Sequence, residues 1–313
     1  MTEIAIHRSG GAPAQRMGFF TDTTVCIGCK ACEVACKQWN DLPADGSEFR
    51  KGGSYDHTGS LGAATWRHVR FVETETPAHL PDIPAARPDA PAPASGGGDF
   101  SLVDAAATGQ STVISPELGS WVFMSDVCKH CTNAGCLDAC PTGALIRTEF
   151  ETVIVQPDVC NGCGYCIPSC PFGVIDRDPY DGRAAKCTLC YDRLGDGQEP
   201  ACAKACPTDS IQFGPYDELV ERAERRVVEL HERGLESAYL YGAGDEGPDQ
   251  LAGGLGAFFL LTEPPERFAL PAQADSPIQA NVPVATAAGL AAGLAAAAGA
   301  VVSVLLAHRR ARR

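Results

Sequence analysis

Sixteen cysteines, arranged as four groups of four, constrain this chain of 313 residues more than any other feature. The groups span residues 26–36, 128–140, 160–170 and 187–206, and no cysteine lies outside them. A disulfide framework is disfavoured, because neighbouring Cys-x-x-Cys pairs are poor structural bridges and residues 1–11 show no apolar signal-peptide core. The formal net charge of −14 argues against a nucleic-acid-binding protein, which would present a basic face. The cysteine groups therefore predict metal sites.

The spacing within the groups distinguishes between metals. Groups one and three share the pattern C-x2-C-x2-C-x3-C, as CIGCKACEVAC and CNGCGYCIPSC. This is the bacterial ferredoxin run, in which three close thiolates hold one cluster and the fourth reaches a second. Groups two and four keep the opening pair and the closing spacing and lengthen the middle loop, which indicates an internal duplication. Sixteen thiolates predict four [4Fe-4S] clusters, and zinc is the weaker alternative, because three such closely spaced cysteines would crowd one tetrahedron.

Residues between the cysteines support this interpretation. We expect positive φ angles at Gly28, Gly162 and Gly164, where the loop must wrap closely around a metal cube. His130 is expected to be a hydrogen-bond donor behind the ligands or a surface residue, because thiolates already fill every site. Clusters with four cysteine ligands have no open iron position, and the glycines form no nucleotide-binding fingerprint. We therefore expect electron transfer, with no catalytic residue in this chain.

Composition divides the rest of the chain. Residues 1–16 are expected to be a disordered lead, and Trp66–Val72 alternates as in a β-strand. Residues 73–120 are rich in Pro, Ala and Gly and indicate a long insertion without a core of its own. A soluble helix is expected within 215–240, with Leu219, Ala223, Val227 and Leu230 on one face, in a helical extension over 215–277.

The C-terminal segment has the character of a membrane anchor. Residues 284–307 are 24 residues without a charge, enough for about 36 Å of helix against a hydrocarbon core of about 30 Å. Gly289 and Gly293 form a G-x-x-x-G spacing that allows another helix to approach closely. The tail 308–313 carries four arginines. By the positive-inside rule, we expect a single-pass cell-membrane protein with a cytoplasmic tail and an extracytoplasmic cluster domain.

The runs KCTLCYDR (186–193), GQEPAC (197–202) and ACPT (205–208), with the four groups in this order, resemble a known family. They are similar to the iron–sulfur subunits of the molybdopterin oxidoreductases, and most of all to the beta subunit of membrane-bound formate dehydrogenase. The resemblance covers about 17–72 and 121–307. It implies an α+β fold with two bacterial-ferredoxin-like dicluster lobes, 17–72 with 185–214 and 121–184, followed by a single transmembrane helix.

The resemblance also implies that ligands cross between the groups, giving four ligand sets. Set 1 is Cys26, Cys29, Cys32 and Cys206, and set 2 is Cys36, Cys187, Cys190 and Cys202. Set 3 is Cys128, Cys131, Cys136 and Cys170, and set 4 is Cys160, Cys163, Cys166 and Cys140.

Finally, the resemblance implies partners. A catalytic alpha subunit with a molybdenum or tungsten pterin would oxidise formate and pass electrons into this chain. A membrane cytochrome b gamma subunit would receive them for quinone reduction in anaerobic respiration. The folded complex would be exported by a twin-arginine signal on the catalytic subunit. The alternatives are an electron-transfer subunit of a hydrogenase or a sulfur-compound reductase, and a free multi-cluster carrier without a fixed enzyme partner.

Overall fold

The computed structural model describes residues 15–44, 56, 58–73, 121–244 and 251–312. The chain divides into two compact units, one comprising 1–70 with 123–313 and the other 71–122. All but residue 73 of the expected insertion lies outside the described residues, and so does the expected lead up to residue 14. At the end of that lead, the carbonyl of Arg16 accepts a hydrogen bond from the backbone N–H of Tyr216 at 2.9 Å.

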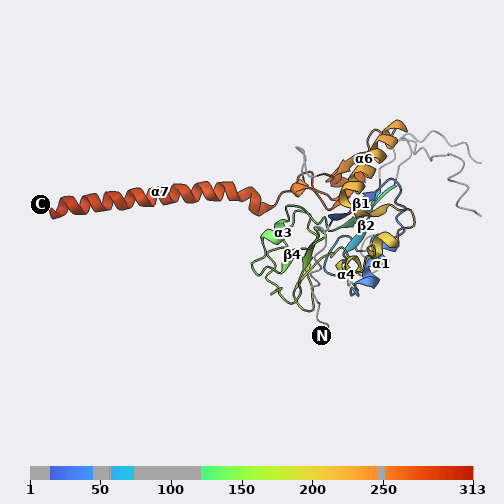
Figure 1. Ribbon diagram of the computed structural model, residues 1–313, viewed down its shortest axis with the longest axis horizontal. Helices are drawn as coiled ribbons and strands as arrows, with labels where there is room; N and C mark the ends of the chain where they lie inside the picture. The colour runs from blue at the N-terminus through green and yellow to red at the C-terminus, as the bar shows by residue number, and fades with distance from the viewer. Residues whose placement is uncertain (1–14, 45–55, 57, 74–120, 245–250, 313) are drawn as a thin grey trace, which may run out of the picture. The chain divides into compact units, whose positions relative to one another are not determined.

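The largest sheet among the described residues has four strands and contains β1, which is labelled in Figure 1. Its strand order is β8-β1-β10-β9, in which β1 is antiparallel to β8 and parallel to β10. Phe19 lies opposite Phe213 in one neighbouring strand and opposite Ala257 in the other. The strands are β1 (Met17–Asp22), β8 (Ile211–Pro215), β9 (Tyr239–Tyr241) and β10 (Ala257–Leu261). Since β1 precedes cysteine group one and β8 follows group four, this pairing brings the two groups together.

The predicted soluble helix is present as α6 (Tyr216–Glu232), which packs against β1, β8 and β9 (Figure 1). It buries Leu219, Ala223 and Leu230, and it ends just before Gly234, whose φ is 88°. Because Pro215 has no backbone N–H and a fixed φ, it suits the position before the first turn.

The prediction that residues 215–277 form a helical extension is wrong beyond α6. The following residues add β9 and β10 to the sheet, with Phe259 opposite Tyr241. β10 has the sequence AFFLL and is buried at every position. A strand covered on both faces is apolar throughout and shows no alternation, so periodicity alone does not identify it.

Short elements hold the cysteine loops in place. In the part of the chain that the structure describes, three further two-stranded sheets pair β2 with β3, β4 with β5 and β6 with β7. The strands are β2 (Arg67–Glu73), β3 (Trp121–Val127), β4 (Leu145–Arg147), β5 (Val153–Val155), β6 (Asp176–Arg177) and β7 (Ala184–Ala185). β2 lies where the sequence predicts a strand. The short helices are α1 (Ala31–Trp39), α3 (Gly135–Asp138), α4 (Tyr191–Gly195), α5 (Ala201–Lys204), η1 (Leu251–Gly253) and η2 (Pro265–Phe268).

The C-terminal helix α7 (Pro277–Ala311) is longer than expected. It begins at Pro277 rather than at residue 284, and it continues into the basic tail. Ser276 caps its N-terminus by accepting a hydrogen bond from the backbone N–H of Gln279. The helix is long and apolar enough to cross a membrane, with a mean hydropathy of 2.3 in a window that is 0% buried.

Candidate metal centres

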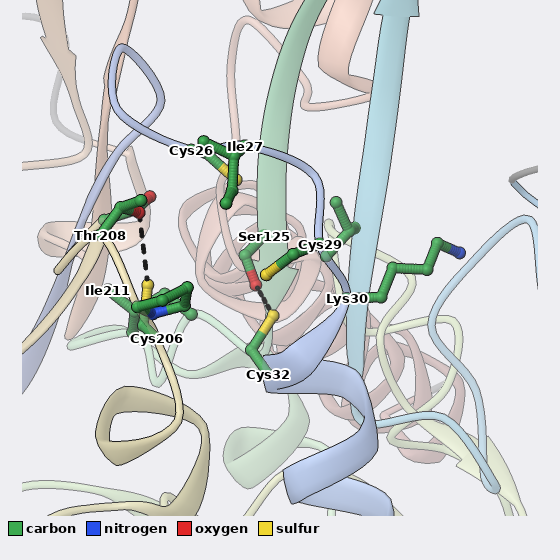
Figure 2. Close-up of a pocket in the computed structure, with 12 residues that line it drawn as sticks. Cys26, Ile27, Cys29, Lys30, Cys32, Ser125, Cys206, Thr208 and Ile211 are labelled. Atoms are coloured by element: carbon green, nitrogen blue, oxygen red, sulfur yellow. Dashed lines mark hydrogen bonds between the residues drawn. The ribbon is translucent and has the colours of Figure 1, made fainter. Parts of the chain in front are cut away.

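The four thiols of set 1 line one cavity (Figure 2). Their sulfur atoms face a common space, and Ile27 and Pro207 complete part of the wall. Two hydroxyls lie beside these sulfurs: Ser125 Oγ is 3.1 Å from Cys32 Sγ, and Thr208 Oγ1 is 3.8 Å from Cys206 Sγ. The structure therefore brings three cysteines of group one together with one of group four.

Set 2 lies in the interior, and all four of its cysteines are buried. Helix α1, which carries Cys36, packs against α5, which carries Cys202. Burial raises the pKa of Cys36 well above the ordinary value, and the nearby Cys187, Cys202 and Cys190 raise it further. The other three members of the set are thus the electrostatic neighbours of Cys36.

Sets 3 and 4 show the same grouping. Burial raises the pKa of Cys131, and the next causes are the other three thiols of its set, Cys128, Cys170 and Cys136. Burial likewise raises the pKa of Cys166 to about 11, and the neighbours that raise it further are Cys140, Cys160 and Cys163. The thiols of each implied set are therefore neighbours. This placement supports the implied assignment of the cysteines to four clusters, which remains a proposal.

Neighbouring sets also approach one another. After the larger effect of burial, Cys202 of set 2 raises the pKa of Cys32 of set 1. In the same way, Cys128 of set 3 acts on Cys187 of set 2, and Cys166 of set 4 acts on Cys136 of set 3.

These electrostatic effects support the order 1-2-3-4 for the implied sets. The two end sets reach the surface, since Cys29 of set 1 and Cys163 of set 4 are exposed. An electron path along this order would start and finish at accessible positions and would pass through the buried thiols of set 2.

One loop conformation recurs in all four groups. The residue before the second cysteine has a positive φ in each: 65° at Gly28, 45° at His130, 72° at Gly162 and 58° at Leu189. The prediction for the glycines, including Gly164 at 79°, is confirmed. His130 and Leu189 were not foreseen, because a non-glycine residue in this region costs roughly 1–2 kcal/mol. The repeated Cys-x-x-Cys spacing is the signal that could have found them.

Backbone amides point at several of the sulfurs. The N–H of Leu189 donates to Cys187 Sγ at 3.3 Å, and that of Ala184 donates to Cys160 Sγ at 3.4 Å. Such bonds favour the thiolate and are among the features that tune iron–sulfur clusters. Within the described ranges, no three His, Cys, Asp or Glu side chains are arranged to hold a single metal ion. Thiols that surround a space, with amides directed at sulfur, fit an iron–sulfur cluster better than a zinc ion.

Of the two alternatives expected for His130, the surface position is wrong, because the residue is buried. Its Nδ1 accepts a hydrogen bond from the backbone N–H of Val153 at 3.1 Å. Burial lowers the pKa of His130 well below the ordinary value, and the positive charges of Lys186 and Arg147 lower it further. The ring is therefore neutral with its proton on Nε2, and its hydrogen bond to β5 holds the group-two loop against the β4–β5 pair.

Sequence reasoning missed the buried cations among the thiols. Arg67, Lys129 and Lys186 are each at most 2% exposed. Arg67 Nη2 donates to Cys202 Sγ at 3.2 Å, Lys129 pairs with Asp126, and Lys186 donates to two backbone carbonyls. Two of the three directly precede or follow a ligand cysteine, but single charged residues at such positions are ordinarily interpreted as surface residues.

Comparison with known proteins gives consistent matches. Two family models, both described as a 4Fe-4S dicluster domain, match residues 25–144 and 119–216. The chain is 40% identical over 221 residues to the formate dehydrogenase iron-sulfur subunit of Haemophilus influenzae, covering 70% of this chain and 58% of that protein. It is 39% identical over 221 residues to the nitrate-inducible formate dehydrogenase iron-sulfur subunit of Escherichia coli, covering 70% and 61%.

A second kind of relative matches over more of its own length. The chain is 32% identical over 202 residues to the B subunit of the anaerobic dimethyl sulfoxide reductase of Escherichia coli, covering 64% of this chain and 75% of that protein. By contrast, the chain spans about three fifths of the length of the formate dehydrogenase relatives. Two dicluster domains and sixteen cysteines fit four [4Fe-4S] clusters.

Proposed function

This protein belongs to the family of iron–sulfur electron-transfer subunits with 4Fe-4S dicluster domains, and from that premise we propose that it serves a membrane-bound formate dehydrogenase. In this role it is a non-catalytic subunit of an oxidoreductase complex. The observation that carries the proposal is the serial placement of four thiol sets with an exposed cysteine at each end. The identity of about 40% to formate dehydrogenase subunits supports formate as the substrate of the proposed complex.

Each ligand set holds one [4Fe-4S] cluster in this proposal, and a bound cluster accepts and releases one electron. The sixteen thiolates bind the iron, and backbone amides such as that of Leu189 stabilise the charge on sulfur. Burial of set 2 keeps water away from the middle of the path. We propose a division into two lobes, with groups one and four in one lobe and groups two and three in the other, and the grouping of the thiols supports it.

The start of α7 suggests a direction for the path. Helix α3 contacts α7 and carries Cys136, and the chain leads from it to Cys140 of set 4. Cys136 belongs to set 3, and of the two end sets, set 4 is the one that the chain reaches directly from this helix through Cys140. We assign set 1 to the catalytic molybdenum- or tungsten-pterin subunit and set 4 to a membrane cytochrome b.

The anchor and its sidedness complete the proposal. Helix α7 crosses the membrane once, and the arginines after residue 308 hold the C-terminus on the cytoplasmic side. The cluster lobes then lie outside the cytoplasmic membrane. In this proposal, residues 73–120 remain an insertion in the sequence between β2 and β3.

A second candidate is an electron-transfer subunit of a sulfur-compound reductase. It is favoured by the B subunit of dimethyl sulfoxide reductase, of which this chain covers 75%. In that case electrons would travel in the opposite direction, from the membrane to the catalytic subunit.

One experiment separates the two candidates. The complex is purified anaerobically with its large subunit, and the clusters are followed by EPR. We expect formate to reduce the oxidised clusters, and dimethyl sulfoxide to leave dithionite-reduced clusters unchanged. Oxidation by dimethyl sulfoxide, without reduction by formate, would contradict the formate dehydrogenase assignment and support the second candidate.

A further inference from the structure

Arg67 is a charged side chain in the interior, with 1% of its surface exposed. A guanidinium stays protonated in proteins, so its charge must be compensated where it lies. Among the described residues, its hydrogen bonds go to a thiol and a serine rather than to a carboxylate. The ring of Phe19 lies 4.7 Å from the guanidinium carbon and covers it from the sheet side.

The hydrogen bonds of Arg67 connect two ligand sets. Nη2 donates to Cys202 Sγ of set 2 at 3.2 Å, and Nη1 donates to Ser125 Oγ at 3.3 Å. Ser125 Oγ in turn lies 3.1 Å from Cys32 Sγ of set 1. An unbroken series of polar contacts therefore runs from set 1 through Ser125 and Arg67 to set 2. Arg67 Nη1 also donates to the backbone carbonyl of Ser125 at 3.2 Å, which fixes the serine relative to the arginine.

We propose that Arg67, with Ser125 as its extension, raises the reduction potentials of both clusters of the first lobe, at sets 1 and 2. The inference rests on the proposed function, because it requires a cluster at each of these sets. In this role, Arg67 and Ser125 position a charge and hydrogen bonds against the ligand sulfurs, and neither residue contacts a substrate.

The physical reason is the charge that a cluster gains on reduction. A fixed cation stabilises the more negative, reduced form, and hydrogen bonds to the sulfurs act in the same direction. Charges interact more strongly in a buried site than in water, so one guanidinium next to two sets acts on both. Burial alone would lower the pKa of Arg67, and the nearby thiols, first Cys202 and then Cys32, raise it above the usual value. The positive charge of Arg67 is thus stabilised by the surrounding thiols.

The test is a potentiometric EPR titration of the fully loaded complex, with variants at these two residues. We expect Arg67→Gln to lower the equilibrium constant for one-electron reduction at sets 1 and 2 about tenfold. This is equivalent to a fall of about 59 mV in each reduction potential. The potentials at sets 3 and 4 should not change. Arg67→Lys keeps the positive charge, so its reduction potentials at sets 1 and 2 should remain close to those of the wild-type protein. Arg226→Met is the matched control, because this partly buried arginine bonds to Asp22, Glu229 and Thr24.

Each outcome bears on the inference. Four unchanged potentials in a loaded Arg67→Gln variant would overturn it, and so would an equal shift at all four clusters, which indicates a general structural effect. If Arg67→Gln fails to load clusters, Ser125→Ala decides, because it leaves the arginine in place. In Ser125→Ala, the reduction potential should fall at set 1 alone. An unchanged potential at set 1 would overturn the inference. A wild-type chain without clusters at sets 1 and 2 would instead contradict the proposed function.

Discussion

Ser276 donates a hydrogen bond from its Oγ to Oδ2 of Asp138 at 3.1 Å, and Gln279 Nε2 donates to the same oxygen at 3.0 Å. The carboxylate at the end of α3 thus holds the first turn of α7. Ser276 is itself the N-cap of that helix. The helix that we assign to the membrane is therefore attached directly to the loop of cysteine group two.

This attachment predicts a local effect of Asp138→Ala. Without the carboxylate, the first turn of α7 should open more readily, because an N-cap interaction contributes about 1 kcal/mol. We expect hydrogen exchange at the amides of 278–282 to accelerate about fivefold in detergent, with all four clusters retained. Asp275→Ala removes a neighbouring exposed acid and is the control. Unchanged exchange in Asp138→Ala would contradict the attachment.

The crossing of ligands between groups predicts which cysteine variants share a defect. Cys206→Ser should remove or alter the same EPR signal as Cys26→Ser, because both line the set 1 cavity. Cys202→Ser, four positions earlier in the chain, should alter a different signal, that of set 2. The measurement is the EPR spectrum of each variant at matched iron content. A shared signal for Cys202 and Cys206 would show that the sets are assigned incorrectly.

The loop of group three predicts the effect of Gly162→Ala. Its φ is 72°, and an added Cβ would lie 2.6 Å from the carbonyl oxygen of Gly182. The strain of about 1–2 kcal/mol and this clash should together displace Cys163 and cause loss of the set 4 cluster. Gly234→Ala is the matched control, since its φ is also positive and a Cβ would meet no atom within 4 Å. Chemical analysis should find about one quarter less iron in Gly162→Ala and no loss in Gly234→Ala. Equal iron content in the two variants would contradict this prediction.

Lys186 is expected to stabilise the boundary between sets 2 and 3. Its Nζ donates to the carbonyl of Cys187 at 2.7 Å and to that of Val153. Lys186→Met should leave these buried carbonyls unpaired and lower the free energy of unfolding by about 1–3 kcal/mol. The readout is the urea concentration at which half of the cluster absorbance is lost. The exposed Lys204 supplies the control variant Lys204→Met, and an equal midpoint in both would show that Lys186 has no such role.

Much of the cysteine chemistry could be predicted because it is local. The spacing of CNGCGYC alone indicates the cluster type, and Gly162 must permit the loop conformation that the spacing requires. α6 was predictable for the same reason, since Leu219 and Ala223 repeat on one face of the helix.

Features that depend on distant partners could not be predicted in this way. β10 is a strand because β1 and β9 lie on either side of it, and its sequence shows no alternation. Arg67 is buried because Cys202 and Ser125 approach it from other segments of the chain. The left-handed conformation of Leu189 is imposed by the loop it belongs to and not by its own preference.

The most direct test of the central claim is a count of iron, acid-labile sulfide and zinc in the anaerobically purified chain. Four [4Fe-4S] clusters predict about sixteen iron and about sixteen sulfide per chain, with no stoichiometric zinc. Zinc bound without sulfide would contradict the account, because the thiol sets would then be structural sites that cannot carry electrons.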